Sequence, residues 1–343
     1  MSTGRTSTAV VSAAALAWMG CERTGTSADS TTSRVTVYCS IDESFGRSVL
    51  DRYRARTGTE LSVIFDSEAG KTTGLVNRIT GEARAGRPRA DVFWSSELFN
   101  TIRLARQGLL EPYVSPAAAD IPERFRDPQH RWTALAARAR VLAFDPQRIS
   151  RDKIPTSWKE LASPAHVKTA VMANPLFGTT RGHVAAMAAM WGGNGMRDWL
   201  RKMRDGGMRV VDGNSAAVRE VIAGRAVLAL TDTDDVWVAQ RSGASLDLCY
   251  PDMGGGGTIL IPCSVAIIKG APNLEGARRL VDFLISAEVE RMLAQSESRN
   301  VPVRKALRTE LNLPWPPEST IAYDEIVDAM PGAVEAVREI LLR

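Results

Sequence analysis

The stretch VTVYCSIDESFGRSVLDRYRARTGTELSVIF, residues 35–65, decides the fold. It begins and ends with short runs rich in β-branched residues, at 35–39 and 61–65, and both runs are predicted strands. Between them, Phe45, Val49 and Tyr53 share one face of a predicted helix that Gly58 ends. A strand, a helix and a strand joined so closely predict a parallel pair with a crossover helix.

The same alternation continues on both sides of a Pro-rich connection at 112–128. The further predicted strands are 91–94, 141–144, 169–172, 209–211, 226–230, 246–250, 259–262 and 265–268. The further predicted helices are 71–83, 98–107, 180–191, 198–203, 215–222, 234–241, 273–286, 288–295 and 334–342. Two successive α/β units without an internal repeat predict two lobes with a cleft between them. In open α/β sheets, ligands bind at the carboxyl ends of the strands.

Composition fits two folded domains. The chain has 343 residues, of which 44% are hydrophobic and 24% charged, so disorder, collagen and coiled coil are poor descriptions of it. The 43 Lys and Arg and the 39 Asp and Glu are spread along the whole chain. A nucleic-acid binder concentrates its basic residues in a patch, so nucleic acid is not an expected partner.

The first 33 residues are interpreted as a secretory signal followed by a flexible tether. Arg5 precedes an apolar run at 9–19 that is too short to span a bilayer, which is typical of a secretory signal. Gly20-Cys21 resembles the end of a bacterial lipobox, although Trp18-Met19 departs from that pattern. We therefore expect a signal peptide at 1–21, lipidation of Cys21 and a flexible Ser/Thr-rich tether at 22–33. The expected location is periplasmic or extracytoplasmic, either lipid-anchored or secreted.

Three cysteines lie beyond the signal segment: Cys39, Cys249 and Cys263. In an oxidising compartment, two of them would form a disulfide and leave one thiol, but the spacing does not choose the pair. Three separate buried thiols are the alternative.

Small and polar residues fill the predicted strand-to-helix turns. These turns are 40–43, 66–73, 95–97, 174–180, 212–215 and 231–235. Free backbone N–H groups at such helix starts bind anions, and the same residue types also serve as plain helix caps. Asp232 and Asp234, for example, fit either role. Six such turns at one end of successive strands favour a binding site.

Catalytic motifs are weak by comparison. Phe65 stands where a P-loop needs its first glycine, and Ala217 where a nucleophile elbow needs its second. The chain contains no HExxH or CxxC pattern for zinc. A binding protein is therefore preferred to an enzyme. An extracytoplasmic hydrolase on the same fold stays as the alternative of another class.

Several segments resemble one known family. They are VTVYCSIDESFGRSVLDRYRARTG, RADVFWSSE, RQGLLEPY, ARARVLAFD, NPLFGTT, DGNSAA, VLALTDTDD, VDFLISAEVE and NVPVR. Over nearly all of 34–305, the chain resembles the periplasmic ferric-iron-binding proteins of ABC importers. The resemblance implies the α/β, two-lobed type 2 periplasmic binding protein fold. Lobe 1 would comprise 34–135 and 264–343, and lobe 2 would comprise 136–263. It also implies a monomeric capture protein whose partners are an ABC permease and ATPase.

The resemblance implies a changed set of ligands for the bound ion. The family's paired tyrosines fall on Asp234 and Asp235, its histidine on Asp42, and its glutamate on Ser96, with Glu97 adjacent. The family's anion-binding turns are retained as Gly178-Thr179-Thr180 and Asn214-Ser215, and its paired arginines as Arg138 and Arg140. Ser40, in the first turn, completes the expected site.

Chemistry leaves three kinds of ligand open. A cleft that holds Asp42, Glu97, Asp234 and Asp235 is acidic and offers only oxygen, which hard cations prefer. Ferric iron or another hard cation with a companion anion is the preferred cargo, and no catalytic cofactor is expected. The same carboxylates suit a polyamine. If Arg138, Thr179 and Asn214 dominate instead, the ligand is a phosphonate or phosphate ester.

Overall fold

The computed structural model describes Met1, Gly4, residues 34–66 and residues 73–342. The predicted lipidation site Cys21, the tether and almost all of the signal segment lie outside the described residues, as do residues 67–72 of the second turn. Among the described helices, none has the length and apolar character needed to cross a bilayer.

The opening segment folds as predicted. Strand β1 (Val35–Cys39) pairs in parallel with β2 (Leu61–Phe65) and with β3 (Val92–Ser95). Helices α1 (Glu43–Thr57), α2 (Thr73–Arg84) and α3 (Leu98–Arg106) each follow one of these strands. Gly58 ends α1 with φ of 69° and donates its N–H to Arg54 O, as a left-handed C-cap requires.

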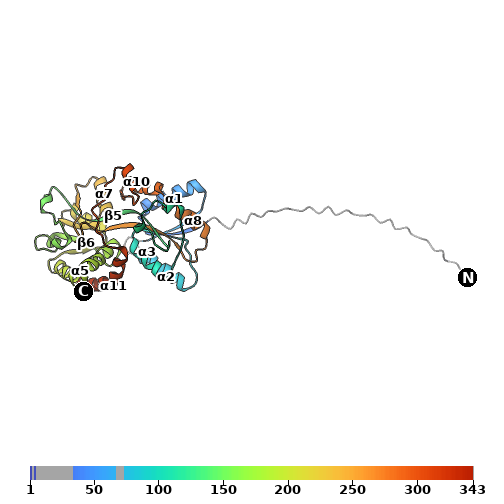
Figure 1. Ribbon diagram of the computed structural model, residues 1–343, viewed down its shortest axis with the longest axis horizontal. Helices are drawn as coiled ribbons and strands as arrows, with labels where there is room; N and C mark the ends of the chain where they lie inside the picture. The colour runs from blue at the N-terminus through green and yellow to red at the C-terminus, as the bar shows by residue number, and fades with distance from the viewer. Residues whose placement is uncertain (2–3, 5–33, 67–72, 343) are drawn as a thin grey trace. The chain divides into compact units, whose positions relative to one another are not determined.

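Two long strands connect the halves of the sheet. The strand order is β2-β1-β3-β10-β5-β8-β6-β7. Strand β5 (Thr133–Phe144) pairs with β10 (Leu260–Ile268) through its first part and with β8 (Leu228–Asp232) through its last. Figure 1 shows β5 between the helices of the first half and those of the second.

Both long strands exceed their predicted lengths. The run TALAARAR in β5 is poor in β-branched residues, so only 141–144 had a strand signal. In β10, Pro262 ends the first of the two short predicted strands, and the register with β5 shifts between Pro262 and Cys263. Both strands are nonetheless buried along almost their whole length, and this tertiary burial keeps them extended.

The second half repeats the strand-to-helix alternation. Its elements are β6 (Ala170–Ala173), α5 (Gly178–Asp205), β7 (Arg209–Val211), α6 (Asn214–Ile222), β8, α7 (Thr233–Arg241) and β9 (Asp247–Cys249). Strands β7, β6 and β8 are parallel, so α5, α6 and α7 all start at the same edge of the sheet. Helix α5 joins the two predicted helices across a kink at Gly192, whose φ of 74° and ψ of 159° are not helical.

The remaining helices cover both halves. They are α4 (Trp158–Leu161), α8 (Leu274–Leu284), α9 (Ala287–Gln295), α10 (Lys305–Glu310) and α11 (Tyr323–Ile340), and β4 (Leu110–Glu111) adds a short strand beside β10. Short 3₁₀ turns occupy 116–118, 123–125, 151–153 and 167–169. Helix α11 packs along α5 and also contacts α3 (Figure 1). The sequence groups 264–343 with lobe 1, whereas the structure places this last helix mainly against α5 of the second half.

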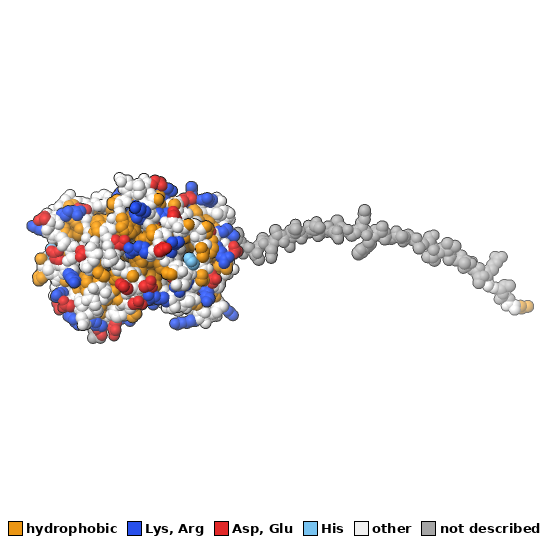
Figure 2. All heavy atoms as spheres, viewed as in Figure 1, with side chains coloured by type: hydrophobic (Ala, Val, Ile, Leu, Met, Phe, Trp, Pro, Cys, Tyr) orange, Lys and Arg blue, Asp and Glu red, His pale blue; other side chains and the backbone are white. Residues whose placement is uncertain are grey.

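The cysteines and the surface charges complete the description. Cys39, Cys249 and Cys263 are all free thiols, and Cys39 and Cys263 are buried. Burial raises the pKa of Cys263 to about 11, so its reactive thiolate is scarce near neutral pH. On the face shown in Figure 2, the basic and acidic side chains are interspersed.

Candidate functional site

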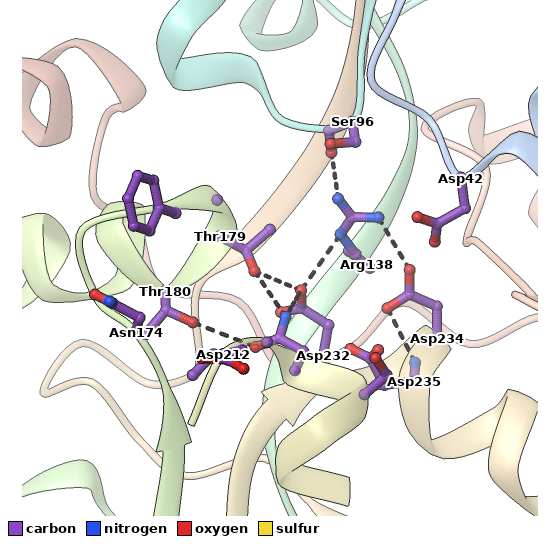
Figure 3. Close-up of a pocket in the computed structure, with 16 residues that line it drawn as sticks. Asp42, Ser96, Arg138, Asn174, Thr179, Thr180, Asp212, Asp232, Asp234 and Asp235 are labelled. Atoms are coloured by element: carbon purple, nitrogen blue, oxygen red, sulfur yellow. Dashed lines mark hydrogen bonds and ion pairs between the residues drawn. The ribbon is translucent and has the colours of Figure 1, made fainter. Parts of the chain in front are cut away.

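A polar pocket lies where the strand-to-helix turns of the second half meet those of the first (Figure 3). Its lining residues are Asp42, Ser96, Arg138, Ala173, Asn174, Phe177, Gly178, Thr179, Thr180, Asp212, Gly213, Asn214, Ser215, Asp232, Asp234 and Asp235. The structure therefore brings together all the predicted site residues except Ser40 and Glu97. Ser40 lies in an adjoining hollow that shares Asp42 and Asp234 with the pocket.

Three aspartates at the start of α7 form the acidic centre of this pocket. Each of Asp232, Asp234 and Asp235 has a carboxylate oxygen within 4.8 Å of those of the other two. Asp232 is the last residue of β8, and the other two lie in the first turn of α7. Asp42, at the start of α1, points toward this group from the first half of the chain (Figure 3).

Arg138 lies among these carboxylates. Its Nη1 donates to Asp234 Oδ2 at 2.9 Å, its Nε is 3.5 Å from Asp232 Oδ2, and its Nη2 donates to the backbone oxygen of Ser96. The side chain is 10% exposed, so the ion pair is largely shielded from water. The sequence associates Arg138 with an anionic ligand and Asp234 with a cationic one. In the structure they neutralise each other.

Asp232 is held by three donors from three elements. Its Oδ2 accepts from Thr179 Oγ1 at 2.6 Å and from Asn214 Nδ2 at 2.8 Å, and its Oδ1 accepts from Arg140 Nη1 at 2.9 Å. Although Asp232 occupies the N-cap position of α7, its side chain makes no capping hydrogen bond. The plain-cap interpretation of Asp232 is therefore wrong.

Arg140 is a buried support for this network. Its side chain has no exposed surface, and its Nε donates to His183 Nδ1 at 3.3 Å. Burial and the neighbouring guanidinium lower the pKa of His183 well below its usual value, so the imidazole accepts as a neutral ring. Arg138 and Arg140 alternate along β5, and this period of two places both on one face of the strand.

Glu97 has a different role from the one proposed. It is fully buried at the N-cap of α3, and its Oε2 accepts from Asn100 N at 3.2 Å. It lines neither the pocket nor the three-carboxylate group. The acidic residue that sequence reasoning left out of the metal set is Asp232. Asp232 lies in the acidic TDTDD turn, which indicates a cation site, but a helix-capping role explains an aspartate at this position equally well.

Glu97 and the cleft carboxylates can be told apart by mutation. Glu97→Gln keeps an oxygen at the cap and is expected to leave ligand affinity within about twofold, since Glu97 lies outside the pocket. Glu97→Ala removes the cap and is expected to cost about 0.5–2 kcal/mol of stability. Urea unfolding and ligand titration measure the two effects. A large loss of affinity in Glu97→Gln would make Glu97 a ligand after all.

The charge of the pocket is negative. Among the residues that the structure describes, five aspartates and one arginine, Arg138, line it. Burial raises the pKa of Asp234 above its ordinary 3.8, and the nearby Arg138 guanidinium offsets part of that effect. The arrangement therefore favours a positively charged guest that shares the carboxylate oxygens.

The raised pKa of Asp234 gives a pH prediction. A cation competes with the proton for this carboxylate, so affinity for the cation is expected to be full at neutral pH. It should fall as the pH drops through a value above 3.8. Titrations of the metal at several pH values measure this. An affinity that rises on acidification would show that Asp234 does not bind the cation in its ionised form.

One relative identified by sequence comparison is an iron uptake protein. The iron uptake protein A1 of Synechocystis is 26% identical over 288 residues, which cover 80% of this chain and 78% of that protein.

Solved structures agree on the fold. Iron-bound HitA from Pseudomonas aeruginosa is 22% identical with a TM-score of 0.78, and covers 90% of this chain and 99% of its own. AfuA from Actinobacillus pleuropneumoniae, with fructose-6-phosphate bound, is 20% identical with a TM-score of 0.75, and covers 90% and 98%. These matches confirm the predicted type 2 periplasmic binding protein fold. Because residues 88–324 also match the family model for bacterial extracellular solute-binding proteins, the chain belongs to that family.

Proposed function

We propose that this protein is the capture subunit of an ABC importer and that its cargo is a hard cation, ferric iron being the best candidate. The observation that carries the proposal is the group of Asp232, Asp234 and Asp235, whose oxygens lie within 4.8 Å of one another. Asp42 faces this group across the pocket. Carboxylate oxygens are the ligands that hard cations prefer.

The relatives support this choice of cargo. The Synechocystis relative is named for iron uptake, and the HitA structure contains iron. The metal set proposed for this chain is Asp42, Asp234 and Asp235 with Asp232. Tyrosine is absent from the described residues that line the pocket, so carboxylates would replace phenolate oxygens around the ion.

Capture would proceed by closure of two lobes joined at β5 and β10. Ala136 in β5 has φ of 43°, and the register between β5 and β10 shifts at Pro262/Cys263. The first lies at the predicted boundary 135/136 and the second one residue before the predicted boundary 263/264, and such irregularities bend a strand locally. Asp42 and Ser96 would approach from lobe 1, and the other ligands from lobe 2.

The contact between α3 and α5 offers a test of closure. A Cβ added at Gly182 in α5 would lie 2.1 Å from the Phe99 ring in α3, so Gly182→Ala cannot keep this contact. Overpacking of about 1–3 kcal/mol would weaken the closed form and is expected to lower ligand affinity about tenfold. Gly81→Ala, where nothing lies within 4 Å of the added carbon, is the control. Equal affinities for both variants would contradict a closing contact here.

The wider assignment follows from the same role. A permease and an ATPase are the proposed partners, and the proposed location is outside the cytoplasm, with Cys21 as a lipid anchor. A hydrolase is disfavoured because His183 is buried against Arg140, and neither His130 nor His166 lines the pocket.

A phosphate ester or phosphonate is the second candidate. Helices α5 and α6 start at the pocket, Arg138 lines it, and the AfuA structure contains a sugar phosphate. The excess of carboxylates weighs against this candidate and also leaves a polyamine as a third.

Thermal unfolding with a ligand panel tests the proposal. The panel is ferric iron, Ca²⁺, spermidine, a small phosphonate and fructose-6-phosphate. A bound ligand at a hundred times its Kd stabilises the native state by about 2.7 kcal/mol. Ferric iron is expected to raise Tm most. A shift with only the phosphorylated ligands would replace this proposal with the second candidate.

A further inference from the structure

Two side-chain donors that an anion would use in this pocket, Thr179 Oγ1 and Asn214 Nδ2, are already engaged. Thr179 stands at the start of α5 and Asn214 at the start of α6, where the retained anion-binding turns were identified. A hydroxyl has a single proton to donate, and that of Thr179 goes to Asp232 Oδ2 at 2.6 Å. Asn214 Nδ2 also donates to this oxygen, at 2.8 Å.

The carboxylate that takes these donors is fixed in place. Asp232 is 2% exposed, its Oδ1 accepts from Arg140 Nη1 at 2.9 Å, and Arg138 Nε lies 3.5 Å from its Oδ2. Thr180 Oγ1 in turn donates to Asn214 Oδ1 at 3.2 Å, which orients the amide with its NH₂ toward Asp232. The arrangement is that of an anion bound between two helix starts and an arginine, with the anion supplied by the chain itself.

We propose that Asp232 is a built-in counter-anion, which takes the place of the companion anion expected from the sequence, so that the protein captures its cation without one. The part of this inference that concerns the bound cation rests on the proposed function. The part that concerns phosphate exclusion by Asp232 does not. An external phosphate would have to displace Asp232 from its three donors or sit beside its negative charge. Arg138 offers it little help, because that guanidinium already binds Asp234 and Ser96.

The first experiment needs no metal. Inorganic phosphate is titrated into the metal-free protein and followed by calorimetry or phosphorus NMR. The wild type is expected not to bind it. Asp232→Asn keeps the size of the side chain but removes the charge, and is expected to bind phosphate at least about tenfold more tightly. Asp212→Asn is the matched control, since Asp212 lines the same pocket but is not bonded to Thr179 or Asn214.

The second experiment measures ferric iron in competition with a hydroxamate chelator, in degassed buffer with and without phosphate. Affinity of the wild type is expected to change by less than about twofold when phosphate is added. Asp232→Asn is expected to bind iron more weakly and to recover part of the affinity with phosphate.

The outcomes separate the two proposals. Phosphate binding by the metal-free wild type, or a wild-type iron affinity that depends on phosphate, would overturn the built-in anion. An equal gain in phosphate binding for Asp232→Asn and Asp212→Asn would also overturn it, because the effect would then be one of net charge. If iron fails to bind under every condition, the proposed cargo fails, and the metal-free titration still decides the role of Asp232.

Discussion

Replacing Arg140 with methionine is expected to lower the free energy of unfolding by about 3–5 kcal/mol. The side chain has no exposed surface and pairs with Asp232, which is 3% exposed at its side chain. Removing the guanidinium leaves a buried carboxylate without its main counter-charge, and it also removes the donor to His183. Urea unfolding followed by circular dichroism measures the change.

Arg52→Met is the matched control for this prediction. Arg52 pairs with Glu288 at 3.2 Å, but its side chain is 64% exposed, and such surface pairs contribute less than about 1 kcal/mol. The double variant Arg140→Met with Asp232→Asn is expected to regain part of the lost stability, because the unpaired charge is gone. Similar losses for Arg140→Met and Arg52→Met would show that the buried network does not stabilise the fold.

The second large expected effect is a loss of affinity for ferric iron. Changing Asp234 and Asp235 together to asparagine is expected to weaken ferric iron binding by at least about a hundredfold. The two carboxylates belong to the group whose oxygens lie within 4.8 Å of one another. Asparagine keeps the size of each side chain, so the secondary structure is expected to stay intact. Competition against a chelator measures the affinity.

A control with the same change of net charge isolates the site. Asp198 and Asp205 lie exposed on α5, in surface pairs with Lys202 and Arg204. Changing both to asparagine is expected to leave iron affinity unaltered. Iron affinity retained in the Asp234/Asp235 variant would move the binding site away from the acidic group and toward the helix starts of α5 and α6.

The turns were predictable from sequence because each follows a strand with a clear apolar signal. The end of β8 runs directly into TDTDD, so the sequence alone indicates Asp234 and Asp235 as site residues. The partner of each side chain was not predictable. Whether Asp232 caps α7 or binds Thr179 depends on where α5 and α6 start in space, and their sequences lie far from Asp232 along the chain.

For Glu97 and α11, too, the sequence does not show which groups they contact in the fold. Ser96 and Glu97 are neighbours, but only Ser96 reaches the pocket, because the extended backbone at the start of α3 directs Glu97 to the Asn100 N–H. The apolar pattern of α11 predicts that one face is buried without saying against which helix. Its packing on α5 was therefore outside the reach of the sequence.

The acidic pocket is proposed to hold a hard cation. The most direct test is metal analysis of the full-length protein, purified without chelators, loaded with ferric iron and dialysed. We expect one tightly held ferric ion per chain in the wild type and none in the Asp234→Asn, Asp235→Asn variant. Wild-type protein that retains no iron, while fructose-6-phosphate or a phosphonate raises its Tm, would show that the pocket does not hold a hard cation.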